Sequence, residues 1–278
     1  MTTATSHQPI LVLGATGKTG RRILERLVAR DVPTRQGSRT ATPPFDWQDQ
    51  RTWEAAVDGA RAAYISFYPD LAVPGAPETV GAFAHTAVQA GAQRLVLLSG
   101  RGEEEARRAE GIVQASGAEV TVLRCSWFTQ NFTEGSFLTD ILSGEVVLPV
   151  GSVGEPFLDA DDIADAAVTA LLEDGHAGHV YELTGPRLLT FEEAVAEIAL
   201  ASGRSISFRT VPLAEYAATL ADFGVPASEV ALLKYLFNEV LDGRNESLTN
   251  GVRQVLGRPA RDLRDSVRTA LAAGALLT

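Results

Sequence analysis

The first half of the chain alternates short apolar runs with stretches in which apolar residues recur every three or four positions. In the stretch after residue 20, Ile23, Leu24, Leu27 and Val28 fall on one helical face, and similar periods predict helices over 78–90 and 103–116. The apolar runs predict strands at 10–13, 34–37, 45–47, 62–66, 94–98 and 120–124. This alternation is typical of βαβ units, so we expect an α/β fold with a parallel sheet.

After residue 125 the alternation loosens, and the second half reads as mainly helical. Helices are predicted over 161–172, 190–202 and most of 213–278, the second starting with a capping box formed by Thr190 and Glu193. Short strands are predicted at 146–150, 179–184 and 206–211, some of them returning to the edge of the sheet. We therefore expect a doubly wound domain over 1–150 and a small α+β substrate-side subdomain over 151–278.

The turn after the first strand carries the strongest chemical signal. Residues 10–20 read Ile-Leu-Val-Leu-Gly-Ala-Thr-Gly-Lys-Thr-Gly, with glycines at every third position from Gly14. Gly14 permits a tight turn, Gly17 lets a pyrophosphate approach the backbone, and Gly20 lets the helix pack on the strand. The start of that helix would hold a dinucleotide diphosphate. The alternative is a tight strand-to-helix connection without a ligand.

The residues after the second strand bear on which dinucleotide binds. An NAD site usually has a carboxylate there, whereas this chain has Ser38 and Arg39. A guanidinium can pair with a 2′-phosphate, so the pattern favours NADP(H), with Lys18 as a second nearby charge. Asp46 could meet the adenine amino group, with Trp47 beside the base. A solvated Arg39 and a capping Asp46 are the alternatives.

Composition excludes some function classes. The net charge of −11 disfavours nucleic acids and anionic membranes as partners. Cys125 is the single cysteine, so no intrachain disulfide can form and a reducing compartment is expected. Residues 1–9 are polar, unlike the apolar core of a signal peptide, and no apolar run is long enough to span a bilayer. We expect a soluble cytoplasmic protein.

The catalytic pair of common short-chain dehydrogenases is missing. Those enzymes place a serine after the strand that corresponds to 94–98, followed by Tyr-x-x-x-Lys on the next helix, where the tyrosine protonates the carbonyl oxygen. Ser99 is present, but there is no tyrosine between Tyr68 and Tyr181, and the only lysines are Lys18 and Lys234. Carbonyl reduction by that pair is therefore disfavoured, and iminium, quinone or enone reduction fits better.

Other candidate groups are weaker. Residues 103–105 are three glutamates and read as a solvated helix start, with a general acid as the alternative. Arg101 could contact substrate or a cofactor phosphate. Cys125 as a nucleophile is disfavoured, because lone buried cysteines are usually inert. The four histidines lack the spacing of metal ligands, so no metal is expected.

Several motifs together resemble the NmrA-like group of atypical short-chain dehydrogenase/reductases. They are Gly-Ala-Thr-Gly-Lys-Thr-Gly at 14–20, Gly-Ser-Arg at 37–39, Leu-Val-Leu-Leu-Ser-Gly at 95–100, Leu-Arg-Cys-Ser-Trp-Phe-Thr-Gln-Asn-Phe at 123–132 and Phe-Leu-Asp-Ala-Asp-Asp-Ile-Ala at 157–164. Within the group, the segments 45–47, 99–105 and 235–245 resemble bacterial relatives of the fungal ergot-alkaloid reductases of the agroclavine-dehydrogenase type.

The resemblance implies a Rossmann domain that binds NADP(H), a small C-terminal domain and a small-molecule substrate. From the residues and the resemblance together, cofactor contacts are expected at Gly14, Ala15, Thr16, Gly17, Lys18, Thr19, Gly20, Ser38, Arg39, Asp46, Trp47, Ser66, Phe67, Ser99 and Gly100. Substrate contacts are expected at Tyr68, Arg101, Trp127, Phe128, Asn131 and Phe132, with hinge packing as the alternative for the aromatic group.

The function expected from these observations is an NADPH-dependent reductase of an activated small molecule (imine or iminium, quinone, or enone), whose catalytic residue stays unassigned. Because the group also contains catalytically silent proteins, two alternatives remain: a regulator that senses NADP(H), and a non-redox auxiliary protein of a biosynthetic pathway. Monomer and homodimer are both compatible with the sequence.

Overall fold

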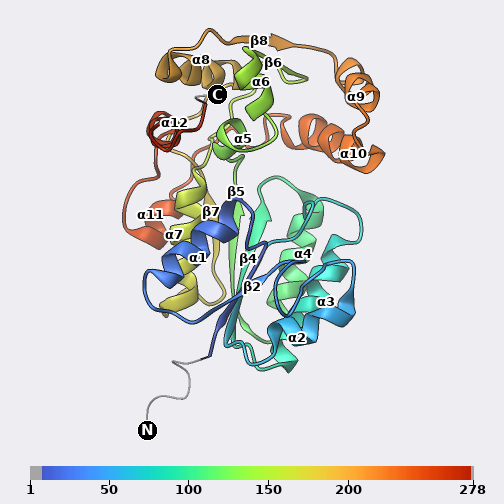
Figure 1. The fold of residues 1–278 in the computed structure, drawn as a ribbon, viewed down its shortest axis with the longest axis vertical. Helices are drawn as coiled ribbons and strands as arrows, with labels where there is room; N and C mark the ends of the chain where they lie inside the picture. The colour runs from blue at the N-terminus through green and yellow to red at the C-terminus, as the bar shows by residue number, and fades with distance from the viewer. Residues whose placement is uncertain (1–7, 277–278) are drawn as a thin grey trace. The chain divides into compact units, whose positions relative to one another are not determined.

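The computed structural model describes residues 8–276, which form two compact units (Figure 1). The first unit comprises the described chain up to Cys125 together with Ala160–Leu183 and Gly251–Arg258. The second comprises Ser126–Asp159, Thr184–Asn250 and the chain from Pro259 onward. This division differs from the expected single boundary at residue 150, because a helix and a strand that follow residue 150 in the sequence belong to the first unit. Most of the polar N-terminal stretch, residues 1–7, lies outside the described residues.

The first unit is built on a six-stranded parallel sheet with the order β2-β1-β3-β4-β5-β7. Its registers pair Leu13 with Gly37 and Gly100 with Cys125, so the loops that follow these strands leave from one edge. The strands are β1 (Ile10–Leu13), β2 (Thr34–Gly37), β3 (Ala62–Ile65), β4 (Arg94–Gly100), β5 (Glu119–Cys125) and β7 (Val180–Leu183). The predicted parallel α/β sheet is thus confirmed.

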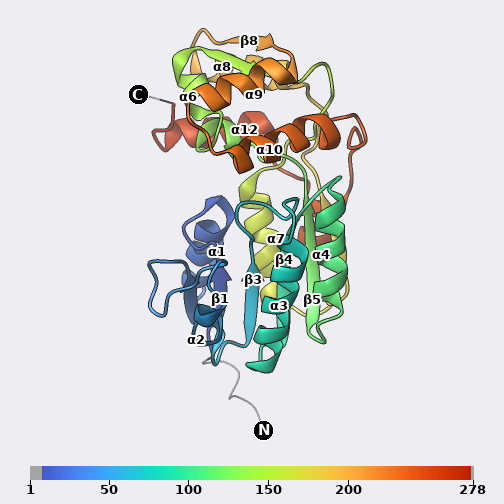
Figure 2. The ribbon, with the colours of Figure 1, turned by 90° about the vertical axis from the view of Figure 1, so that its right-hand side faces the viewer.

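Helices cover both faces of this sheet, as the two views show (Figures 1 and 2). On one face α1 (Lys18–Val28) packs against α7 (Ala160–Leu172), and α11 (Gly251–Leu256) packs on α7 and β7. The other face carries η1 (Gln50–Thr52), α2 (Trp53–Val57), α3 (Ala76–Gln89) and α4 (Glu104–Gln114). The sheet is therefore doubly wound, as the sequence predicts.

Alternate strand residues supply the two cores. Leu95 and Leu97 of β4 pack in the core beneath α2, α3 and α4, which places the intervening Val96 on the face of α1 and α7. On α1, Ile23 and Leu27 are buried as the periodicity predicts, but Val28 is 60% exposed. The prediction for Val28 is wrong: Val28 is the last residue of the helix, and its side chain lies off the face that buries Ile23 and Leu27.

The strand predicted at 45–47 is absent. Asp46 forms only an isolated bridge with Asp49, and the backbone N–H of Phe45 donates to the carbonyl of Ser38 at 2.8 Å. Pro43 and Pro44 precede this segment and carry no N–H for a ladder. The segment is a loop that turns back onto the end of β2, and β2 remains an edge strand.

The second unit is mainly helical. Its two strands, β6 (Glu145–Leu148) and β8 (Ser207–Thr210), pair with each other and not with the large sheet; of the three late predicted strands, only β7 joins that sheet. The predicted capping box is confirmed at α8, where Thr190 and Glu193 exchange side-chain bonds to backbone N–H groups. The helices are α5 (Gln130–Thr133), α6 (Leu138–Ser143), α8 (Phe191–Ser202), α9 (Leu213–Asp222), α10 (Ala227–Tyr235), the π-helical η2 (Leu236–Val240) and α12 (Leu263–Ala272).

Candidate functional site

The glycine turn joins β1 to α1 as the sequence predicts. Gly14 has φ of +65°, in the left-handed region that favours glycine, and its carbonyl accepts the N–H of Gly17 at 2.8 Å. A Cβ at Gly20 would overlap the carbonyl oxygen of Gly14, so only glycine lets the helix pack this closely. At Gly17 a Cβ would meet only that same oxygen, at 3.2 Å, which leaves the outer side of the turn open to a ligand.

Helix α1 begins in a form that suits an anion. Gly17 is the N-cap, no side chain caps it, and the first turn carries no acidic residue. The first N–H groups of a helix lack partners within the helix, and the dipole adds partial positive charge there. A diphosphate fits this helix start, whereas an Asp or Ser cap would compete for the same N–H groups.

Arg39 lies beside this turn, since the N–H of Gly14 donates to the carbonyl of Gly37 at 3.1 Å and Ser38 follows directly. Arg39 is exposed and makes no hydrogen bond or ion pair with any residue between 8 and 276. Ser38 is half-buried, and its hydroxyl lies 3.4 Å from that of Thr40. The guanidinium of Arg39 is therefore available to a ligand phosphate.

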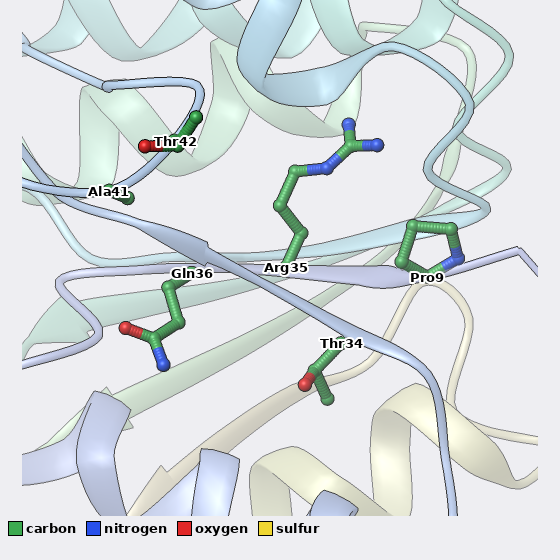
Figure 3. Close-up of a pocket in the computed structure, with 6 residues that line it drawn as sticks. All are labelled: Pro9, Thr34, Arg35, Gln36, Ala41 and Thr42. Carbon is green, nitrogen blue, oxygen red and sulfur yellow. The ribbon is translucent and has the colours of Figure 1, made fainter.

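Arg35, in β2, differs from Arg39, just after β2, because its guanidinium is held by hydrogen bonds to the protein. Its guanidinium donates to the carbonyls of Ala56 and Asp58 and so ties β2 to the end of α2. A pocket of about 360 Å³ lies along this edge strand, and Arg35 and Gln36 point to opposite sides of the strand (Figure 3). The pocket shares no residue with the glycine turn, so we assign it no part in dinucleotide binding. It is lined by Pro9, Thr34, Arg35, Gln36, Ala41 and Thr42.

Asp46 and Trp47 serve local structure. A carboxylate oxygen of Asp46 accepts the N–H of Gln48 at 2.9 Å. This is the capping role that was the alternative to an adenine contact. The indole N–H of Trp47 donates to the carbonyl of Ser66 at 3.2 Å, and its ring packs edge-on against Phe45 and Phe83. These contacts link the loops after β2 and β3, while the predicted adenine contacts stay a prediction.

Tyr64 was not anticipated from the sequence, although it supports the turn directly. Its hydroxyl donates to the Thr19 hydroxyl at 2.9 Å, and both side chains are buried. Burial raises the pKa of Tyr64, so the phenol stays protonated and keeps donating. The next residues of the same strand and loop, Ser66 and Phe67, are half-buried, and Tyr68 is 71% exposed.

Replacing Tyr64 with phenylalanine should lower the free energy of unfolding by about 1 kcal/mol, because the buried Thr19 hydroxyl loses its partner. Denaturant unfolding measures this change. Tyr68→Phe is the matched control, since that ring is mostly exposed, and it should leave stability unchanged. Equal stability of the Tyr64 variant and the control would contradict a supporting contact to the turn.

Ser99, predicted beside the cofactor, donates its hydroxyl to Glu110 at 2.6 Å and is 4% exposed. The same carboxylate accepts two bonds from Arg124, which also donates to Glu182 at 2.8 Å. Arg101, predicted to bind substrate or phosphate, is 7% exposed and lies 3.5 Å from Glu182. These charges pair internally at the ends of β4, β5 and β7, so ligand contacts by Ser99 and Arg101 stay predictions.

Glu103 is buried, whereas the sequence pattern predicted a solvated helix start at residues 103–105. It is 6% exposed, not solvated like Glu104, and its carboxyl occupies the space that a side chain at Gly100 would fill. Burial, the hydrogen-bonded carboxyl of Asp70 and the charge of Glu110 hold the pKa of Glu103 well above its usual range. Periodicity could not reveal this, because three consecutive glutamates look alike in sequence.

The remaining candidate on β5 is Cys125, which is buried. Burial, with a contribution from Glu103, raises the pKa of its thiol, so it stays protonated and is a poor nucleophile. This agrees with the expectation that Cys125 is inert.

Four predicted substrate residues belong to the second unit. Phe132 is fully buried and packs against Phe137 and Phe157, so its side chain is part of the hydrophobic core of the second unit, and its contact with substrate stays a prediction. Trp127 is half-buried, stacks on Phe137 and donates its backbone N–H to Glu155. Phe128 and Asn131 are half-buried and stay predictions.

Between residues 8 and 276, no three His, Cys, Asp or Glu side chains gather as a metal site would need. Over the same residues, no helix is both long and apolar enough to cross a membrane.

Comparison with known proteins gives the family. No family model matches the chain. Agroclavine dehydrogenase of Claviceps fusiformis is 31% identical over 281 residues, covering 93% of this chain and 96% of the relative. An NAD(P)H azoreductase of Xenophilus azovorans is 26% identical and covers 95% and 98% of the two chains.

Among solved structures, the NADPH complex of an Escherichia coli quinone oxidoreductase superposes with a TM-score of 0.78 at 22% identity, covering 94% of this chain and 99% of that one. This likeness supports the fold alone. The agroclavine dehydrogenase is more than 30% identical to this chain over almost the whole length of both, and the glycine turn and the doubly wound sheet agree with that relationship. The chain therefore belongs to the NmrA-like atypical short-chain dehydrogenase/reductases and is an NAD(P)H-dependent oxidoreductase of that family.

Proposed function

We propose that this protein is an NADPH-dependent reductase of an activated small molecule: an imine or iminium, a quinone, or an enone. The observation that carries the proposal is the start of α1, which no side chain caps, with the guanidinium of Arg39 beside it and without a partner among residues 8–276. The helix start suits a diphosphate, and Arg39 with Ser38 suits the 2′-phosphate that distinguishes NADPH from NADH. A bound NADPH would supply the hydride.

The chain's own residues limit how a reduced substrate gains a proton. No tyrosine lies four residues before a lysine, and the Ser99 hydroxyl is bonded to Glu110. A substrate whose carbon is already electron-poor suits such a site, because hydride addition then needs little help from a protein acid. The quinone named for one similar protein falls within this range, and the azo group named for another is likewise an electron-poor π bond, although it accepts hydride at nitrogen.

A panel of cyclic iminium salts, quinones and enones tests the proposal, with NADPH oxidation followed by its absorbance. The purified protein should oxidise NADPH with at least one acceptor, and only slowly without one. Tight NADPH binding with no turnover against the whole panel would contradict the reductase and favour the NADP(H)-sensing alternative. The non-redox auxiliary alternative predicts that Arg39→Ala lowers the melting temperature but leaves pathway flux intact.

A further inference from the structure

We propose that the groove along the outer edge of β2 binds an extended peptide segment that carries an acidic side chain. The groove has a volume of about 360 Å³ and lies wholly within the first unit, where β2 and the loop at Ala41 and Thr42 line it (Figure 3). It shares no residue with the glycine turn and does not include Arg39, so this inference goes beyond the proposed reductase.

The backbone of β2 is paired on one side only. Within residues 8–276, β2 pairs with β1 and with no other strand. The carbonyl of Pro33 accepts the N–H of Ile10 at 2.9 Å, and every second residue from there on faces β1. Thr34 and Gln36 therefore direct their N–H and C=O groups away from β1. None of these four groups has a hydrogen-bond partner within the described chain.

An open edge of this kind can take up another strand. Proteins commonly block such edges with proline, lysine or a bulge. The four residues of β2 include no proline or lysine, and their register with β1 has no bulge. An extended peptide can therefore add its N–H and C=O groups to those of Thr34 and Gln36. The groove gives room for its side chains, since its volume falls within the range of ligand pockets, about 300–1,000 Å³.

Arg35 determines which charge the peptide should carry. Its Nη1 atom donates to the carbonyls of Ala56 and Asp58, which holds the guanidinium at the wall of the groove. The Nε and Nη2 atoms make no hydrogen bond or ion pair with any residue between 8 and 276. These two atoms lie on one edge of the guanidinium, and that edge is the fork that binds a carboxylate. An aspartate or glutamate of the peptide matches it.

A second copy of this chain suits the groove less well. Antiparallel pairing of two β2 strands about a two-fold axis would bring both Arg35 side chains to the same face of the joined sheet, where like charges repel. Each strand would also contribute only four residues. An acidic peptide from a partner avoids this repulsion.

The first test measures the preference for charge. The probes are a fluorescein-labelled peptide of sequence Ser-Thr-Val-Glu-Val-Thr and the same peptide with glutamine in place of glutamate, and fluorescence anisotropy follows binding. The wild type should bind the acidic peptide about fivefold more tightly, because charge-assisted hydrogen bonds are stronger than neutral ones. Arg35→Gln should remove this preference. Arg30→Gln, at an exposed arginine outside the groove, is the matched control and should keep it.

The second test blocks the added strand. In Gln36→Pro the ring replaces an N–H that points away from β1, so the pairing with β1 remains while the incoming strand is obstructed. This variant should bind the acidic peptide at least about tenfold more weakly, since it loses a backbone bond and adds a clash. Gln36→Ala keeps the N–H and should bind as the wild type does.

Hydrogen exchange of the wild type gives a readout that needs no variant. The amides of Thr34 and Gln36 should exchange rapidly in the free protein and become protected when the acidic peptide is added, whereas the amide of Arg35, which faces β1, should be protected in both states. Exchange followed by NMR resolves the three positions.

Several results would overturn the proposal: no binding of the acidic peptide, equal affinity of the wild type for the two peptides, equal binding by Gln36→Pro and Gln36→Ala, or no added protection of Thr34 and Gln36. A wild-type dimer in sedimentation experiments that Gln36→Pro converts to a monomer would overturn it in favour of a second copy. None of these results bears on NADPH oxidation, so the proposed function stands or falls separately.

Discussion

Replacing Arg39 with aspartate is expected to weaken NADPH binding by about 100-fold while NADH affinity changes by less than about threefold. A charge-assisted bond contributes about 1.5–3 kcal/mol and each tenfold in Kd is about 1.4 kcal/mol, so losing the bond and adding a repelling carboxylate reaches this size. Arg39 has no partner of its own within residues 8–276, so the change should leave the fold intact. Fluorescence titration with both dinucleotides measures the effect.

Arg30→Asp is the matched control for this experiment. Arg30 is an exposed residue after α1, and among the described residues its guanidinium donates only to the Arg26 carbonyl. Its replacement by aspartate makes the same change of charge as Arg39→Asp. It should alter neither affinity by more than about twofold, because exposed charges at a distance are screened. Equal losses of NADPH and NADH on changing Arg39 would remove the assignment of NADP(H).

Gly20→Ala should lower the free energy of unfolding by about 3 kcal/mol and greatly weaken NADPH binding. The added Cβ would overlap the backbone of the glycine turn, and backbone cannot rotate away as a flexible side chain can. Helix α1 must then shift from the sheet, which moves the N–H groups that would hold the diphosphate. Urea unfolding and NADPH titration give the two measurements.

A second glycine provides the contrast. Gly111 lies within α4, and a Cβ there would meet nothing within 4 Å. Gly111→Ala should therefore stabilise the protein by about 0.5–1 kcal/mol through helix propensity, with NADPH binding unchanged. If Gly20→Ala were as well tolerated as Gly111→Ala, the close approach of α1 to the turn would be refuted.

Local rules were sufficient for much of the fold. The apolar run at 10–13, the alternation of strands with helices, and the capping box of Thr190 and Glu193 all appear as expected. These features depend on neighbours in sequence: buried strands need continuous apolar side chains, and helix starts need a cap within three residues. The glycine turn could be predicted for the same reason, because its steric demand arises within seven residues.

Long-range packing decided what local rules could not. The pattern at 45–47 looks like a strand, yet its aromatic rings pack with Trp53 and Phe83 while its backbone forms a loop. Ser99 and Arg101 look available to ligands, but ion pairs and hydrogen bonds with distant residues engage them. Neither outcome could be predicted without knowing which strands lie side by side.

By itself, the sequence determined that this protein has a glycine turn after its first strand and an arginine after its second, and that it lacks the tyrosine–lysine pair. Each is a matter of residue type and short spacing. Only the tertiary structure distinguished Arg39 from Arg35 and Glu103 from Glu104, because charge availability and burial depend on what folds over each side chain. A carboxyl group keeps its proton only where other elements of the fold remove water and add negative charge around it.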